Sequence, residues 1–220
     1  MTAPARTGPA RLSLMTERVV VFDLGMVLCS PNRLFEGLGD LLGTGPDAIE
    51  KAFWGDHRHS YDEGIDDVEF WRQAYPLVEG AREVDLEQLV PELVAIDIAG
   101  WKTPRPGSRR IMERLKEEGV ETAVLSNAPR SFADAAPTFD WYDLIGTWFF
   151  SGQLKVAKPD PGIYQKVEEG LGRTGDQLWF VDDKQVNIDA ALARGWNAHL
   201  WVDDADTEAW LVREGFLPEA

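Results

Sequence analysis

Five short apolar runs that do not alternate with polar residues are the feature that most constrains this 220-residue chain. They are RVVVFDL (18–24), VETAVLS (120–126), TWFF (147–150), LWFVDD (178–183) and AHLWV (198–202). Such runs are typical of strands that are buried on both faces. Helical patterns lie between them, at 106–119, 161–172 and 187–195. Alternating strands and helices predict an α/β fold with a doubly wound parallel sheet.

Residues 31–100 interrupt this alternation. They contain helical patterns and no convincing strand, at 32–43, 47–55, 66–75 and 86–96. Because this segment directly follows the first strand, we predict a helical cap domain over a site at the strand ends. The core domain would comprise 18–30 and 101–220. Residues 1–17 are predicted to be a disordered tail, in which Met15 is an alternative start to Met1.

The charge of the chain narrows the range of partners. Lys and Arg number 22 against 38 Asp and Glu, which gives a formal net charge of −16. So acidic a surface repels nucleic acid and anionic lipid and favours a bound divalent cation. No apolar stretch is long enough for a membrane span. Cys29 is the only cysteine, so no intrachain disulfide can form. We therefore expect a cytoplasmic protein with a small-molecule partner, and a homodimer is possible.

Polar residues stand where several predicted strands end. Asp23 ends the first strand, Ser126 the second, and the pair Asp182–Asp183 the fourth. In open α/β sheets, ligands bind beyond these carboxyl ends. Carboxylates gathered there need a cation to neutralise them, and Mg²⁺ prefers oxygen ligands. Lys158, at the start of a helix, adds a positive charge. The residues thus predict a Mg²⁺-assisted phosphoryl site.

Four motifs occur in a characteristic order: FDLGMVL (22–28), LSN (125–127), AKPD (157–160) and VDDKQVN (181–187). Together they resemble the motifs of the haloacid dehalogenase superfamily. The DLG-x-V form is similar to the subgroup that contains bacterial glucose-1-phosphate phosphatases. The resemblance implies a Rossmann-like core with a C1-type helical cap inserted after the first motif. It also implies a Mg²⁺-dependent phosphatase acting on a small phosphorylated metabolite, for which we expect a sugar phosphate.

The resemblance also implies a catalytic and metal-binding set. Asp23 would be the nucleophile that becomes an aspartyl-phosphate. Mg²⁺ would be held by Asp23, Asp183 and the backbone carbonyl of Gly25. Covalent catalysis of this kind divides one difficult displacement into two easier ones.

The remaining motif residues would bind and orient the phosphoryl group. Ser126 and the backbone amide of Asn127 would hold its oxygens, and Lys158 would neutralise its charge. Asp182 and Asn187 would orient the lysine and the metal ligands. From the residues alone, Asp182 fits capping of the following helix equally well, and Ser126–Asn127 fits a turn.

Gly25 departs from the family pattern. Most phosphatases of the superfamily carry a general acid/base aspartate there. That role is worth about 10²–10⁴ in rate, or roughly 3–5.5 kcal/mol of barrier. A good leaving group would need less help, or a side chain of the cap or a water would supply the proton.

The cap would select the substrate. Trp54, His57 and Tyr61 are the predicted substrate contacts. His57 and His59 form an H-x-H pair with no evident third ligand, so we do not expect a metal site there. The titratable residues that cluster here, and so could replace the missing acid, are His57, His59, Tyr61, Asp62 and Glu63.

Two other functions compete with a phosphatase. A 2-haloacid dehalogenase also uses an Asp nucleophile but needs no Mg²⁺, and the pair Asp182–Asp183 argues against it. A non-catalytic protein that binds a phosphate ligand would be supported only by Gly25. Asp23, Lys158 and Asp183 oppose that reading.

Overall fold

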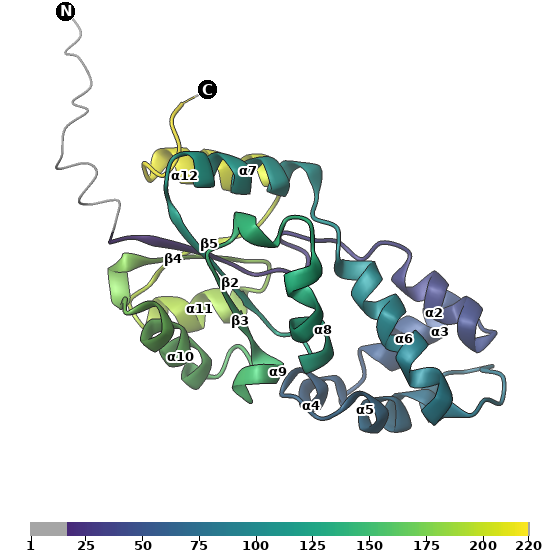
Figure 1. Ribbon diagram of the computed structural model, residues 1–220. Coiled ribbons are helices and arrows are strands. Elements are labelled where there is room, and N and C mark those ends of the chain that lie inside the picture. Colours follow the sequence, from purple (N-terminus) through teal and green to yellow (C-terminus); the bar gives the residue numbers. More distant parts are fainter. Residues whose placement is uncertain (1–16, 220) are drawn as a thin grey trace, which may run out of the picture.

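One five-stranded sheet forms the centre of the molecule, in a computed structural model that describes residues 17–219 (Figure 1). All strands are parallel, in the order β3-β2-β1-β4-β5. They are β1 Val19–Phe22, β2 Glu121–Ser126, β3 Thr147–Phe150, β4 Leu178–Asp182 and β5 Asn197–Leu200. Each lies within two residues of a predicted strand, which confirms the fold class. The predicted tail and the alternative start at Met15 fall on residues 1–16, outside the described residues.

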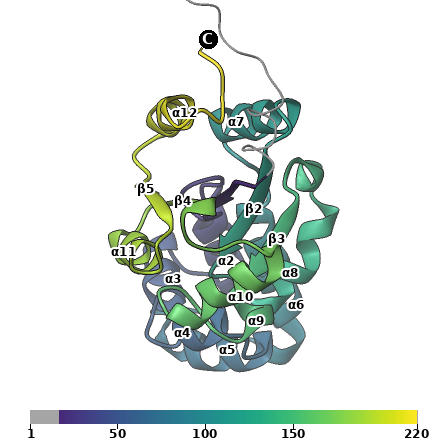
Figure 2. The ribbon, with the colours of Figure 1, turned by 90° about the vertical axis from the view of Figure 1, so that its left-hand side faces the viewer.

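Helices cover both faces of the sheet (Figures 1 and 2). One face carries α7 (Pro106–Glu117) and α12 (Asp204–Arg213), and the other carries α10 (Pro161–Leu171) and α11 (Gln185–Ala193). Alternate residues of β1 belong to two different apolar clusters. Val20 and Phe22 cluster with residues of α7 and α12, whereas Val19 and Val21 cluster with residues of α10 and α11. Because both faces of the strand are buried, its sequence does not alternate.

Capping residues explain where the helices begin and end. Asp160 accepts a hydrogen bond from the backbone of Gly162 (2.7 Å) at the start of α10, and Gly172 ends this helix at φ 63°. The helix α12 was not predicted, although Asp203 caps it and two acids follow in its first turn. The short helices α8 (Arg130–Ala135) and α9 (Ser151–Leu154) were also missed. No helix within residues 17–219 is long and apolar enough to span a bilayer.

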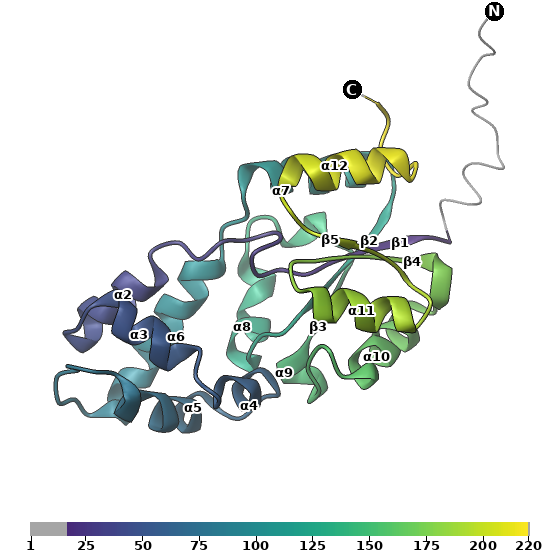
Figure 3. The same cartoon turned by 180° about the vertical axis from the view of Figure 1, so that it is seen from behind.

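Residues 31–100, called the insertion below, consist of helices joined by loops and contain no strand, as predicted. The helices are α2 Leu34–Leu42, α3 Pro46–Phe53, α4 Arg58–Asp62, α5 Asp67–Ala74 and α6 Leu86–Trp101, with a 3-10 turn at Tyr75–Leu77. They lie together beyond the end of β1, as Figures 1 and 3 show from opposite sides. Of these helices, only α4 had no counterpart in the sequence pattern. The division into a cap and a core domain stays a prediction.

The interior of the insertion is built around Tyr61. Its ring is fully buried and stacks on Phe70, with the ring centroids 3.8 Å apart. Its hydroxyl donates to Asp67 Oδ1 (2.6 Å), which also accepts from Ser131 Oγ (2.8 Å) on α8. Tyr61 is therefore a packing residue that also orients Asp67, the link between the insertion and the core.

We predict that Tyr61→Ala lowers the free energy of unfolding by about 3–5 kcal/mol, because it empties the space of a buried aromatic ring. Tyr61→Phe keeps the stack and loses one hydrogen bond, so the loss should be about 1 kcal/mol. Urea unfolding of both variants measures the difference. Equal, small losses in the two variants would contradict this role for the ring.

Candidate active site

The polar residues predicted at the strand ends lie together at one edge of the sheet. Asp23, Ser126 and the pair Asp182–Asp183 end the adjacent strands β1, β2 and β4. The backbone N–H of Asp23 donates to Val181 (2.8 Å), which continues the pairing of β1 with β4. The order of the strands changes direction here, because β2 and β3 lie on one side of β1 while β4 and β5 lie on the other. Crevices at such switch points are the usual ligand sites of α/β sheets.

Lys158 joins two of these strands through a buried ammonium group. Its side chain is only 1% exposed, and its Nζ lies 2.8 Å from Asp23 Oδ1 and 2.7 Å from Asp182 Oδ2. It also donates to the carbonyl of Leu125 on β2 (2.8 Å). Burial alone would lower the pKa of Lys158, but the two carboxylates outweigh it and raise this pKa. The ammonium therefore stays charged.

Asp182 faces Lys158 and is fully buried. Asn187 donates to both of its oxygens (2.9 and 3.0 Å), and the backbone of Lys184 donates to Oδ1 (2.8 Å). With Lys158 on Oδ2, both carboxylate oxygens already have partners. Asp182 therefore orients the Lys158 ammonium and also accepts hydrogen bonds from Lys184 and Asn187 at the start of α11.

Of the carboxylates at the strand ends, Asp23 and Asp183 line the cavity. Oxygens of Asp23, Asp182 and Asp183 lie within 4.8 Å of one another. Burial, together with the negative charges of Asp182 and Asp183, raises the pKa of Asp23 to about 7 against the opposing effect of Lys158. The pKa of Asp183 is also raised, by burial and then by Asp182. Gly25 lines the same cavity as Asp23 and Asp183, the other predicted ligands. The ammonium of Lys158 balances only one of the three clustered carboxylate charges. Such an oxygen set fits Mg²⁺.

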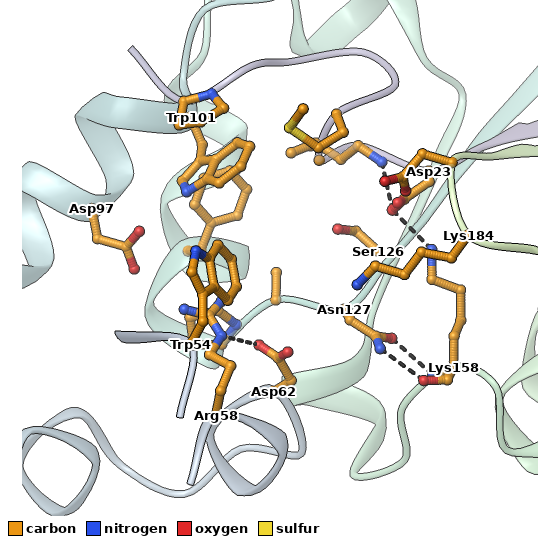
Figure 4. A pocket seen from close by; sticks show the side chains of 18 of the residues that line it. Asp23, Trp54, Arg58, Asp62, Asp97, Trp101, Ser126, Asn127, Lys158 and Lys184 are labelled. Carbon is orange, nitrogen blue, oxygen red and sulfur yellow. Dashed lines mark hydrogen bonds and ion pairs between the residues drawn. The ribbon is translucent and has the colours of Figure 1, made fainter. Parts of the chain in front are cut away.

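Ser126 and Asn127 face the same cavity and have different partners. The Ser126 hydroxyl points into the cavity (Figure 4). The Asn127 amide exchanges two hydrogen bonds with the backbone of Lys158, donating at 2.9 Å and accepting at 2.8 Å. The side chain of Asn127 thus holds the Lys158 loop in place.

The cavity between the sheet edge and the insertion has a volume of about 420 Å³. Its sheet side carries the residues described above together with Lys184, whose side chain points inward in Figure 4. The insertion, with Trp101 at the end of α6, contributes a wall of aromatic and charged side chains, which are Phe35, Glu50, Trp54, Arg58, Asp62, Asp97 and Trp101. Sequence reasoning missed Lys184 and most of this wall.

Of the three predicted substrate contacts in the insertion, only Trp54 lines the cavity. Its side chain is 47% exposed. Tyr61 is buried against Phe70, and the His57 ring also packs on Phe70 (5.3 Å between centroids), so neither lines the cavity. Their contact with a substrate stays a prediction. Residues four apart share a face of a helix. On α4, Arg58 and Asp62 are four residues apart and both line the cavity, one position after His57 and Tyr61.

The two histidines of the H-x-H pair have different surroundings. His59 lies at the surface, 3.5 Å from Glu63, whereas the Nε2 of His57 is buried and has no hydrogen-bond partner among the described residues. Within residues 17–219, the one cluster with metal-ligand spacing is that of Asp23, Asp182 and Asp183.

Comparisons with known proteins agree with this geometry. A phosphatase of Mycobacterium tuberculosis (strain CDC 1551 / Oshkosh), MT3486, is 29% identical over 212 residues, which cover 91% of this chain and 94% of the relative. A HAD family enzyme of Bacteroides thetaiotaomicron, in complex with magnesium and inorganic phosphate, superposes with a TM-score of 0.65 at 22% identity, over 83% of this chain and 93% of that one.

A third similarity is to the L-2-haloacid dehalogenase of Xanthobacter autotrophicus with chloropropionic acid covalently bound. Its TM-score is 0.66 at 18% identity, over 91% of this chain and 84% of that chain. At such identities, the two structures support the fold alone. The model of the family described as haloacid dehalogenase-like hydrolase matches residues 17–195, which include all four motifs and the insertion. The chain therefore belongs to the haloacid dehalogenase-like hydrolase family.

Proposed function

We propose that this hydrolase is a Mg²⁺-dependent phosphatase that acts on a small phosphorylated metabolite through an aspartyl-phosphate on Asp23. The observation that carries the proposal is the position of Asp23. It lies between the Lys158 ammonium, 2.8 Å away, and Asp183, a second carboxylate facing the same cavity. A phosphoryl group needs both a nucleophile and concentrated positive charge. The phosphatase relative, which spans most of both chains, supports the same reading.

The side chains divide the work of the reaction. Asp23 Oδ1 accepts from the backbone of Leu24 (2.7 Å) and from Lys158, which fixes the carboxylate for attack on phosphorus. A bond from Asp23 to phosphorus forms while the ester P–O bond breaks, and the departing oxygen takes the electron pair and a proton. Water then attacks phosphorus, which releases phosphate and restores Asp23.

Charge neutralisation comes from fixed groups of the site. Lys158, held by Asp182, would stabilise the transferring oxygens together with the Ser126 hydroxyl and the Asn127 backbone N–H. Bound Mg²⁺ would supply further positive charge to these oxygens. Asp23, Asp183 and the carbonyl of Gly25 would hold it.

The wall of the insertion supports a sugar phosphate as substrate. Phe35, Trp54 and Trp101 offer apolar ring surface, and Asp62 and Asp97 offer hydrogen-bond acceptors. Faces of aromatic rings beside carboxylates suit a leaving group that carries both C–H and hydroxyl groups. This chemistry does not specify which sugar.

A cytoplasmic location is part of the proposal. Cys29 is the only cysteine and is buried, which fits a reducing compartment. A homodimer stays a prediction, and light scattering on the purified chain would measure the assembly directly.

We expect Asp23→Asn to reduce release of phosphate from p-nitrophenyl phosphate by about 10³-fold or more, because an amide is not a nucleophile. The exposed Asp176→Asn is the matched control and should keep wild-type activity. Unfolding midpoints of both variants verify that they fold. A folded Asp23→Asn variant that retained Mg²⁺-dependent turnover would rule out the covalent mechanism.

Chelation by EDTA should silence hydrolysis of p-nitrophenyl phosphate, and added Mg²⁺ should restore it, because Asp23 and Asp183 need a counter-ion to meet a phosphate ester. Phosphate release and halide release from 2-chloropropionate are measured side by side. Halide release by the chelated protein would favour a dehalogenase. Phosphate binding without turnover of any ester would favour a ligand-binding protein.

Trp54→Ala should raise KM for sugar phosphates about fivefold, the equivalent of roughly 1 kcal/mol of lost ring contact, with a smaller effect on kcat. Leu77→Ala removes an exposed apolar side chain elsewhere in the insertion and is the control. Kinetics on a panel of sugar phosphates give the comparison. An unchanged KM across the panel would remove Trp54 from the substrate contacts.

A further inference from the structure

The active site lacks a proton donor at the position where the family pattern has one. Gly25 lines the cavity two residues after Asp23 but carries no side chain. A Cβ there would meet only ring carbons of Trp101, at 3.7 and 4.0 Å, which is ordinary contact. The first atom of a side chain would therefore fit at this position, and glycine leaves the departing oxygen without the acid that the family pattern places there.

The insertion offers several titratable side chains, and the structure separates them. Of the five that cluster between His57 and Glu63, Asp62 is the one that lines the cavity. Tyr61 is buried in the interior of the insertion, and His59 and Glu63 pair with each other outside the cavity. Asp62 is thus the member of this group that can meet a ligand.

Two other carboxylates of the insertion line the cavity, and each is less suited to proton transfer. Asp97 lies behind Trp54 and Trp101, on the side away from Asp23 (Figure 4). Glu50 is exposed to solvent on α3. Asp62 lies on the other side of Trp54, toward Asn127 and Lys184.

Asp62 is held firmly in this place. Its side chain is 14% exposed, and Oδ1 accepts from Arg58 Nε (2.9 Å). The Arg58 guanidinium lies over the rings of Phe53 and Trp54, 4.5 and 4.8 Å from their centroids. Among the described residues, this is the only hydrogen bond to the Asp62 carboxyl group, so Oδ2 is free for a ligand.

The backbone of the Asp62 segment is fastened to the core. Ser151 Oγ donates to the carbonyl of Asp62, and Lys155 Nζ donates to the carbonyl of Gly64 (2.7 Å). Both donors belong to the segment that leads from β3 to the Lys158 loop. Asp62 is therefore carried by the part of the insertion that is hydrogen-bonded directly to the catalytic core.

We propose that Asp62 is the proton donor that takes the place of the acid missing at Gly25, an inference that rests on the proposed phosphatase function. As Asp23 attacks phosphorus and the ester P–O bond breaks, the carboxyl proton of Asp62 moves to the departing oxygen. In the second step, the Asp62 carboxylate accepts a proton from the water that attacks the aspartyl-phosphate. Each turnover thus returns Asp62 to its protonated form.

The surroundings of Asp62 suit both directions of transfer. Burial raises the pKa of this carboxyl group above its ordinary value, while Arg58 and then Lys184 and His59 oppose the shift. The protonated form is therefore more accessible than at the surface, and the carboxylate that remains after transfer has the Arg58 guanidinium beside it.

The test compares esters whose leaving groups differ in basicity. Asp62→Asn should lower kcat/KM for alkyl and sugar phosphates by about 10²–10⁴-fold, because an alkoxide needs a proton to depart. The loss should be much smaller for p-nitrophenyl phosphate, since nitrophenolate leaves without one. The matched control is Glu63→Gln, which changes a neighbouring carboxylate outside the cavity and should follow the wild type.

A rescue variant tests the same role from the other side. Gly25→Asp in the Asp62→Asn background places a carboxylate where the family pattern has it and should restore much of the alkyl phosphatase activity. Equal losses for all esters in Asp62→Asn would assign Asp62 a structural role and overturn the proposal. The proposal would also be overturned if Lys184→Gln, and not Asp62→Asn, lost more activity on alkyl phosphates than on p-nitrophenyl phosphate. A wild-type protein inactive on every ester would instead refute the phosphatase function.

Discussion

The buried ammonium of Lys158 is the interaction on which the rest of the site depends. It separates Asp23 from Asp182, which could not both stay ionised at this burial without a cation between them. Removing one partner of a buried ion pair typically costs about 3–5 kcal/mol, because the other charge is left uncompensated. Lys158 thus joins β1 to β4 and also places positive charge where a phosphoryl group would arrive.

The second constraint is the attachment of the insertion to the core. Ser131 contacts Asp67, Ser151 contacts the Asp62 backbone, and Lys155 contacts Gly64. All three contacts hold the segment from α4 to the start of α5 against the segments that follow β2 and β3. The side chains that α4 presents to the cavity therefore have fixed positions relative to the nucleophile, which is what a specific substrate and a proton transfer both require.

Gly25 explains why an acid from the insertion is needed. With a carboxylate two residues after the nucleophile, the core would carry both the attacking group and the acid. With glycine there, the proposed acid comes from Asp62, so the nucleophile and the proton donor belong to different parts of the chain. Catalysis then depends on the docking of the insertion, and both its aromatic wall and its acid act on the same leaving group.

Local patterns were sufficient for the strands, for most helices and for the residues at the strand ends, because burial on both faces and parallel pairing leave few alternatives for runs such as VVVF. Asp23, Ser126, Lys158 and Asp183 could therefore be placed from the sequence. The residues of α4 that line the cavity could not be predicted, because a helix of five residues is too short for its sequence pattern to show which side is buried. Tyr61 packs on Phe70 inside the insertion, so the residues of α4 that line the cavity are Arg58 and Asp62. That choice depends on contacts between segments distant in sequence, which no local pattern records.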